Sequence, residues 1–250
     1  MFASAVRAAL SSIFWVFLTV TSLLCFPIAV LIWAITSPFD SRRRALHQFT
    51  CFWASLYTWF NPIWPVSIEG RERIRRGRTY VMVANHQSLL DILVLFRLFT
   101  HFKWVSKEEI FRVPCIGWNM SMNRYIKLRR GDKESIASMM RHSGETLERG
   151  SSLMIFPEGT RSVDGRLKPF KTGAFVLAKK HRIPLLPILI QGTSAALPKR
   201  GFILRGYHRI RVRILDEIPV ESFEHLSVDE LTERTHDHFE GKLEEMAAEA

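Results

Sequence analysis

The sequence predicts an α/β fold, in which a mixed, partly parallel sheet is flanked by helices and preceded by an N-terminal hydrophobic helical membrane anchor. Two observations carry this prediction. No charged residue occurs between Ala8 and Phe39, and after Gly70 short apolar runs alternate with longer stretches of helical periodicity. Strands that alternate with helices favour a sheet buried between helical layers. A chain of 250 residues has room for one such domain and an anchor.

The uncharged stretch from Ala8 to Phe39 is long enough for a helix that crosses a hydrocarbon layer of roughly 30 Å. Pro27 lies within it and is expected to kink or divide that helix. A cleaved signal peptide is disfavoured, because the run is longer than an ordinary signal and no small-residue cleavage site follows it. Three arginines, Arg42 to Arg44, follow the run and only Arg7 precedes it, so the remaining chain is expected on the cytoplasmic face.

A second aromatic-rich segment runs from Phe49 to Ile68, and Pro62 and Pro65 mark its end. Tryptophan and tyrosine at this density favour a membrane interface, although a core helix also uses them. Two arrangements therefore stay open. The anchor is either one spanning helix with an interfacial second helix, or a hairpin that dips into one leaflet.

The rest of the chain is expected to contain strands at Tyr80–Ala84, Phe102–Val105, Tyr125–Leu128, Ser152–Phe156, Leu185–Gln191 and Ile210–Leu215. Helices are expected at Ser88–Phe99, Lys133–Arg149 and Thr172–Lys180, and the acidic segment after Ser222 is helix-prone. This organisation divides the chain into anchoring helices at 1–65, an α/β domain at 66–215 and an acidic helical tail at 216–250. Functional side chains are expected in loops at strand ends.

The formal charge of +11 is unevenly distributed: residues 41–215 carry 32 Lys and Arg against 11 Asp and Glu, and the last 35 residues carry 12 acids against two bases. A basic body joined to an apolar anchor indicates an anionic membrane surface and anionic substrates. Nucleic acid is not expected as a partner, because the sequence contains no nucleic-acid-binding module. Neither a metal nor a cofactor is expected, since the candidate site below lacks further clustered ligands.

The stretch from Asn85 to Asp91, with the sequence NHQSLLD, stands where a predicted strand meets a predicted helix. Ser88 suits an N-cap position, and Asp91 three residues later suits the carboxylate of a capping box. His86 and Asp91 then meet if the histidine lies in the preceding turn. A carboxylate that holds one ring nitrogen frees the other to accept a proton from a hydroxyl group. The same pattern is also compatible with an ordinary capped helix beside a histidine.

A second stretch, FPEGTRS, follows the predicted strand at 152–156 and offers a glycine, two hydroxyl groups and a guanidinium suited to phosphate. Two further stretches are Pro114–Trp118 with Tyr125–Asp132, and Ile183–Ile188. Four such stretches, in this order and at these separations, resemble those of the glycerolipid acyltransferases that make phosphatidic acid from lysophosphatidic acid. The resemblance covers roughly Val66 to Thr193.

The resemblance implies transfer of a fatty acyl group from acyl-CoA or acyl carrier protein to lysophosphatidic acid at a membrane, with no cofactor. His86 and Asp91 would be catalytic, the histidine as general base and the aspartate as the group that orients it. Backbone N–H groups near the His86 turn are the expected donors to the oxyanion. Two other readings remain. The acceptor is a different one (glycerol 3-phosphate, another lysophospholipid or a lyso-aminolipid), or the chain binds lipid without turnover.

The resemblance also implies substrate-binding residues. Arg161 and Arg130 would hold the phosphate, and alternation along the strand favours Arg130 over Arg129. Glu158, Gly159 and Thr160 belong to the same phosphate-binding loop, where Glu158 and Gly159 are expected to shape the loop. Lys107 matches a lysine that is often present in the family, and a simple surface lysine is the equal alternative.

Overall fold

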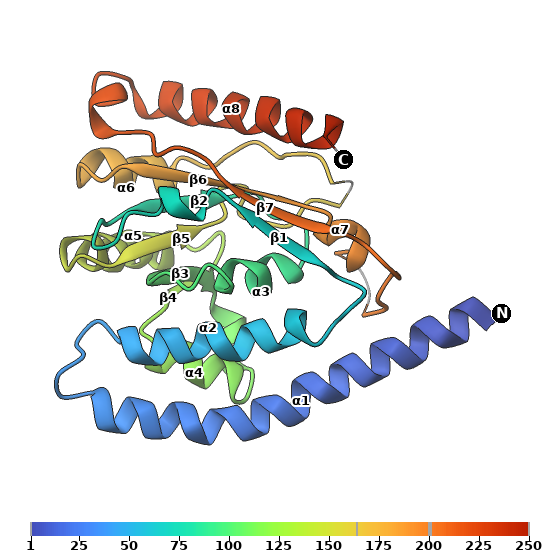
Figure 1. Cartoon of the computed structure of the whole chain (residues 1–250). Helices are drawn as coiled ribbons and strands as arrows, with labels where there is room; N and C mark the ends of the chain where they lie inside the picture. The colour runs from blue at the N-terminus through green and yellow to red at the C-terminus, as the bar shows by residue number, and fades with distance from the viewer. Residues whose placement is uncertain (1, 164, 200–201, 250) are drawn as a thin grey trace.

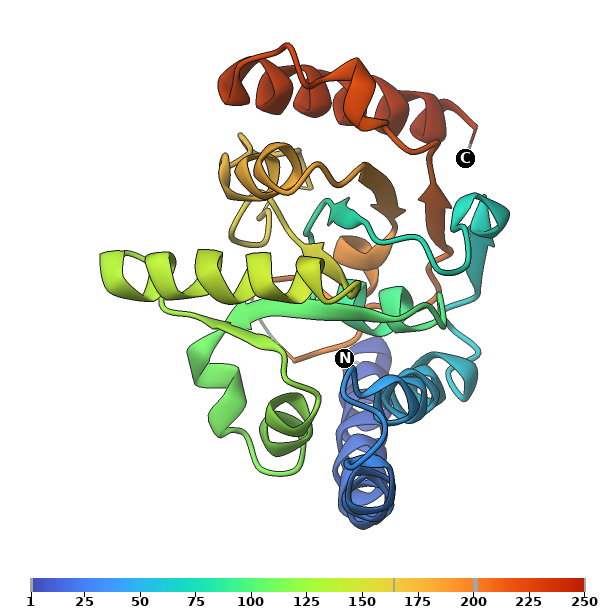
Figure 2. The ribbon, with the colours of Figure 1, turned by 90° about the vertical axis from the view of Figure 1, so that its left-hand side faces the viewer.

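The structure, a computed structural model, describes residues 2–163, 165–199 and 202–249. The chain folds into three layers, with a seven-stranded sheet between two groups of helices (Figures 1 and 2). This arrangement confirms the predicted α/β class with a mixed sheet.

The sheet has the strand order β1-β7-β6-β2-β5-β3-β4. Its strands are β1 (Val66–Glu69), β2 (Val81–Ala84), β3 (Phe102–Lys107), β4 (Ile126–Leu128), β5 (Ser152–Ile155), β6 (Leu185–Gln191) and β7 (Ile210–Ile214). Strands β6, β2, β5, β3 and β4 are mutually parallel, and β7 runs antiparallel to β6 and parallel to β1. Five carboxyl ends therefore lie on one edge of the sheet.

The burial of each strand explains whether its sequence is apolar throughout or alternates between apolar and polar residues. Every residue of β2 is buried, because helices cover both faces of the central strand, and its sequence is accordingly apolar throughout. In β7 only alternate residues are buried, and the intervening Arg211 and Arg213 pair with Glu69 and Glu249.

One face of the sheet is covered by α1 (Phe2–Thr36), α2 (Arg44–Trp59), α3 (Leu90–Phe96) and α4 (Ile116–Met122), which share one apolar core with it. The other face is covered by α5 (Lys133–Glu148), α6 (Gly173–Lys180) and α8 (Val228–Ala248). The short helix α7 (Thr193–Ala196) follows β6, and three 3₁₀ turns lie at Arg71–Arg73, Glu108–Arg112 and Val220–Ser222. The acidic segment is helical, and α8 buries Phe239 and Met246 completely.

The second aromatic segment does not form one element. Its helix, α2, ends at Trp59, and Val66–Glu69 pairs with β7 as an edge strand. Pro62 and Pro65 separate the two elements, since proline interrupts helical hydrogen bonding. The strand β1 was absent from the sequence prediction, because four residues directly after aromatic, proline-rich sequence show no periodicity of their own.

Helix α1 runs unbroken through Pro27, and Figure 1 shows that it changes direction along its length. It is long and apolar enough to cross a membrane. One face is nevertheless covered by the rest of the chain from Ser11 to Ala29, whereas residues such as Ile13 and Leu31 are exposed. The helix therefore lies along the protein.

A buried lysine fixes the α1–α2 turn to the sheet. Lys103 of β3 donates hydrogen bonds to the backbone oxygens of Arg42 and Asn123, each at 2.7 Å. Burial lowers the pKa of its ammonium group to about 7. The first bond joins the α1–α2 turn to β3, and the second joins the end of α4 to the same strand.

Candidate active site

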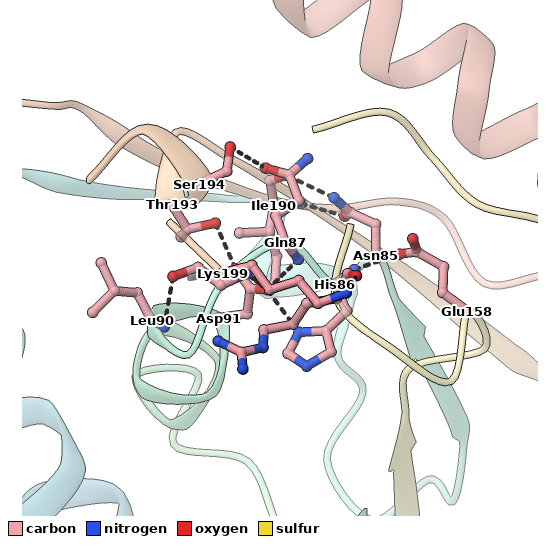
Figure 3. A network of polar contacts seen from close by, with 12 residues as sticks. Asn85, His86, Gln87, Leu90, Asp91, Glu158, Ile190, Thr193, Ser194 and Lys199 are labelled. Carbon is pink, nitrogen blue, oxygen red and sulfur yellow. Dashed lines mark hydrogen bonds and ion pairs between the residues drawn. The ribbon is translucent and has the colours of Figure 1, made fainter. Parts of the chain in front are cut away.

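Three strand ends bring the site together at the carboxyl edge of the parallel strands. His86 follows β2, Glu158 follows β5, and Thr193 follows β6 after Gly192. The Asn85 side chain joins two of these ends, because it donates to the backbone oxygen of Ile190 (2.9 Å) and accepts from the backbone N–H of the same residue (2.8 Å). Figure 3 shows these side chains converging on the turn that contains His86.

His86 and Asp91 are in direct contact. Nδ1 of His86 lies 2.8 Å from Oδ2 of Asp91, and the carboxylate is fully buried. The contact fixes Nδ1 as the donor and leaves Nε2 as the acceptor of the neutral ring. Among the described residues Nε2 has no hydrogen-bond partner, and His86 lines the main cavity.

Asp91 accepts four hydrogen bonds, and one of them, from the Ser88 N–H, is the carboxylate half of the expected capping box. Its Oδ2 also accepts from the backbone N–H groups of Gln87 (2.6 Å) and Ser88 (2.8 Å), and its Oδ1 accepts from the Thr193 hydroxyl (2.5 Å). Helix α3 begins only at Leu90, without a side-chain cap. The Ser88 hydroxyl accepts from Leu90 N–H and donates to the backbone oxygen of Leu197. The turn is thus organised around the carboxylate rather than around a serine cap.

Three N–H groups of this turn are already bonded to carboxylates, which narrows the expectation that N–H groups near His86 stabilise an oxyanion. The N–H groups of Gln87 and Ser88 point to Asp91, and the N–H group of His86 donates to Oε1 of Glu158 at 2.6 Å. These three donors are used to build the turn, so an oxyanion needs N–H groups other than those of His86, Gln87 and Ser88.

Glu158 holds the backbone of His86. Its side chain is buried, and its second oxygen accepts from the N–H group of Lys168 at 3.2 Å. On the other side of the histidine, the backbone N–H of Ser162 donates to the His86 carbonyl at 2.8 Å. Burial raises the pKa of Glu158 to about 7, and the charge of Asp91 adds to this effect. These contacts join the loop that contains Glu158 to the backbone of the His86 turn.

The imidazole of His86 is also held by stacking. The ring of Phe156 lies parallel to it, with centroids 3.9 Å apart and an interplanar angle of 8°. Phe156 also stacks with Trp104, with ring centroids 5.4 Å apart and an interplanar angle of 30°. With Nδ1 bonded and one ring face covered, the imidazole has a single orientation toward the cavity.

A cavity of about 740 Å³ opens at His86. Most of its wall is apolar and comes from both sides of the sheet edge, with Leu93 and Phe96 on α3 and Met140 on α5 as examples. Basic side chains also line it, namely Lys107, Arg130, Arg161, Lys171 and Lys199. An apolar interior beside cationic groups suits an amphiphile with an anionic head.

The structure brings most predicted substrate-binding residues to this cavity. Gly159, Thr160 and Arg161 line it beside His86. Gly159 has a φ of +69°, a left-handed conformation that favours glycine, and a Cβ there would also approach the flexible Lys171 side chain to 2.9 Å. Burial lowers the pKa of the Arg161 guanidinium, and the nearby charge of Arg130 acts in the same direction.

The two neighbouring arginines separate as the strand alternation predicts. Arg130 lines the cavity, whereas Arg129 pairs with Glu108 (2.8 Å) and Asp132 (3.2 Å). Lys107 lines the cavity and forms an ion pair with Glu109 at 2.9 Å.

Several residues of the site were not predicted from the sequence. Thr193, which binds Asp91, follows a predicted strand, and the rule that sites lie at carboxyl ends would have flagged it. Lys199 donates to the backbone oxygen of Arg161 at 2.7 Å and lines the cavity. No local pattern distinguishes Lys199 or Lys171 from surface lysines.

The fold and this site define the class of protein: the chain belongs to the acyltransferase family, whose family model matches residues 65–191. It is 40% identical over 178 residues to a chloroplastic 1-acyl-sn-glycerol-3-phosphate acyltransferase of Brassica napus, covering 70% of this chain and 51% of the relative. A 1-acyl-sn-glycerol-3-phosphate acyltransferase of Saccharomyces cerevisiae is 34% identical over 186 residues, covering 72% and 60% of the two chains. The chain thus spans about half the length of the first of these relatives.

A solved structure is similar over nearly the whole chain. The crystal structure of the 1-acyl-sn-glycerophosphate acyltransferase PlsC from Thermotoga maritima superposes with a TM-score of 0.70 at 25% identity, covering 94% of this chain and 98% of that one. The resemblance on which the sequence analysis relied is confirmed at the level of the family and the fold.

Proposed function

We propose that this chain transfers a fatty acyl group from an acyl thioester, acyl-CoA or acyl carrier protein, to the sn-2 hydroxyl of 1-acyl-sn-glycerol 3-phosphate, which makes phosphatidic acid. The observation that carries the proposal is the His86–Asp91 pair at the wall of an apolar cavity with basic residues around it. The names of the relatives support lysophosphatidic acid as acceptor.

The proposed mechanism needs no covalent acyl-enzyme. Nε2 of His86 takes the proton of the acceptor hydroxyl as its oxygen attacks the thioester carbonyl carbon, and a C–O bond forms. Asp91 stabilises the imidazolium through the bond at Nδ1. Collapse of the tetrahedral intermediate breaks the C–S bond, and the imidazolium returns its proton to the thiolate. The products are an ester and a free thiol.

The proposed substrate contacts follow the distribution of charge. The phosphate of the acceptor binds to Arg161 and Arg130 beside Thr160, and Lys107 adds positive charge at the same cavity. Glu158 and Gly159 act on the shape of the loop, because Glu158 is bonded to the backbone of His86. The acyl chains occupy the apolar part of the cavity.

We further propose that the chain works at a membrane, with the α/β part on the cytoplasmic face. The arginines that follow α1 support this orientation. The covered face of α1, from Ser11 to Ala29, supports the arrangement in which α1 and α2 enter one leaflet, because a helix packed along the domain cannot leave it to cross the bilayer. The division into an anchor at 1–65, a catalytic part at 66–215 and a C-terminal helix at 216–250 belongs to the same proposal.

The test uses the purified full chain in mixed liposomes, with oleoyl-CoA and acyl carrier protein as separate donors, each with and without lysophosphatidic acid. Free thiol and phosphatidic acid are measured together. We expect acceptor-dependent release of thiol that is lost in His86→Ala and retained in His142→Ala, an exposed histidine of α5. Binding of labelled lysophosphatidic acid should persist in His86→Ala.

Each alternative has its own signature. Thiol release that depends on another lysolipid, and not on lysophosphatidic acid, would reject the acceptor. Lipid binding without thiol release from either donor would identify a binding protein rather than an enzyme. Activity that survives in His86→Ala would reject the proposed base.

A further inference from the structure

The loop between α7 and β7 exposes large apolar side chains to solvent. The exposed fractions of Phe202, Ile203 and Tyr207 are 68%, 56% and 61%, whereas Leu204 between them is buried. A loop held by one buried leucine while its aromatic and aliphatic neighbours face outward is unusual for a surface in water. This loop, residues 202–208, plays no part in the site described above.

The loop is bonded to the apolar helix α1. The backbone N–H of Leu204 donates to the Ser11 hydroxyl at 2.9 Å, and the indole N–H of Trp15 donates to the backbone oxygen of Phe202 at 2.8 Å. The rings of Trp15 and Phe202 also meet edge to face, 5.4 Å apart. These contacts place the exposed side chain of Phe202 beside the N-terminal half of α1.

A second segment presents an exposed aromatic residue beside the same helix. Trp118 of α4 is 50% exposed, and its ring lies 5.4 Å from that of Phe26 on α1. Val113, just before α4, is also exposed. Two parts of the chain that are far apart in sequence therefore extend the apolar surface of α1 at two points along its length.

Positive charge accompanies both segments. Arg205 and Arg209 are exposed in or next to the loop, and Arg112 is exposed before α4. Apolar and aromatic side chains flanked by arginine are the composition of a surface that enters the interface of an anionic bilayer. Tryptophan and tyrosine are enriched at that depth.

We propose that the 202–208 loop and Trp118 insert into the same lipid leaflet as α1 and α2, so that two segments of the α/β part add to the membrane-binding surface. The partner is a lipid surface with anionic head groups. The inference rests on the membrane association proposed above, and it adds that the α/β part itself contacts the lipid. The orientation of the protein is then fixed by two contacts of the α/β part in addition to the helical anchor.

Depth-dependent fluorescence quenching tests the proposal. An environment-sensitive dye is attached to Ile203→Cys or Trp118→Cys, and the same label is placed on Leu23→Cys, on the exposed face of α1, and on Glu240→Cys of α8, which lies on the opposite side of the molecule (Figure 2). The native cysteines are buried and do not compete for the label. The vesicles contain phosphatidylcholine with or without phosphatidylglycerol and a quencher at a known depth in the acyl chains.

Blue-shifted, quenched emission at positions 203, 118 and 23, but not at 240, is the expected result. In a separate variant, Phe202→Ser with Ile203→Ser, partitioning into vesicles should fall by about tenfold or more, because two apolar side chains no longer leave water. Labels at 203 and 118 that behave like the label at 240, while the label at 23 is quenched, would overturn the inference and leave the anchor intact. Absence of quenching at 23 as well would overturn the membrane proposal together with it.

Discussion

The buried carboxyl group of Glu158 offers a sharp test of how the site is built. Oε1 accepts the N–H of His86 at 2.6 Å, and burial raises the pKa of the group from 4.5 to about 7. Glu158→Gln keeps an oxygen that accepts the His86 N–H, and it replaces the carboxyl group with an amide that does not titrate. Glu158→Ala removes the acceptor and leaves a buried N–H group without a partner.

The sign of the pH effect follows from the raised pKa. Between about pH 4.5 and pH 7 the native state holds a proton on Glu158 that the unfolded state has lost, so stability falls as the pH rises through this window. A shift from 4.5 to about 7 corresponds to about 3 kcal/mol in total. The difference in free energy of unfolding between the wild type and Glu158→Gln should therefore change by up to about 3 kcal/mol across the window.

Measurements of kcat/KM distinguish a role of Glu158 in positioning His86 from a role in the chemical step. We expect kcat/KM of Glu158→Gln to stay within about fivefold of the wild type, since one ordinary hydrogen bond to Lys168 N–H is lost. In Glu158→Ala, an unsatisfied buried N–H at about 1–3 kcal/mol should reduce kcat/KM by about 5- to 150-fold. Unfolding of each variant is followed from pH 4.5 to pH 8 in the same detergent. A Glu158→Gln enzyme as inactive as His86→Ala, or one with the pH profile of the wild type, would refute this reasoning.

Two further predictions concern side chains that contact the same site. Thr193→Val removes the hydroxyl that binds Asp91, and kcat should fall by about 10- to 100-fold. Thr193→Ser retains the hydroxyl, and its kcat should stay close to that of the wild type. Equal losses of kcat in both variants would contradict this prediction. Arg130→Ala should raise the KM for the phosphate-bearing acceptor by about tenfold or more. Arg129 pairs with Glu108 outside the cavity, so Arg129→Ala should leave that KM unchanged. A raised KM in Arg129→Ala and an unchanged KM in Arg130→Ala would assign the phosphate to Arg129.

Local patterns predicted much of the fold. The apolar runs that gave β2 and β6 are strong signals, because central strands are buried on both faces and contain no polar residue that interrupts the run. The helix α3 is shorter than predicted at both ends. Asp91 is committed to the His86 turn at its start, and Phe99 adopts a positive φ of 51° beyond its end. Element boundaries depend on such contacts, which a linear pattern does not contain.

The candidate site was predictable where one stretch of chain contains both partners. His86 and Asp91 are five residues apart, and the turn geometry needed for their contact could be stated from the sequence alone. The bond between Glu158 and His86 spans 72 residues, and the bond between Thr193 and Asp91 spans 102. Contacts at that separation depend on the strand order, which places β5 and β6 on either side of β2.

Two buried carboxyl groups lie next to one histidine, and each contacts a different part of it. Asp91 meets the ring nitrogen and accepts four hydrogen bonds, an environment suited to a charged carboxylate that stabilises an imidazolium. Glu158 reaches only the backbone N–H of His86, and its pKa of about 7 lets it hold a proton of its own near neutrality. Asp91 belongs to the segment that follows β2, and Glu158 follows the neighbouring strand β5. The environments of the two carboxyl groups therefore suit different roles. Asp91 is suited to stabilise positive charge on the imidazole ring, and Glu158 is suited to hold the backbone of His86 in place.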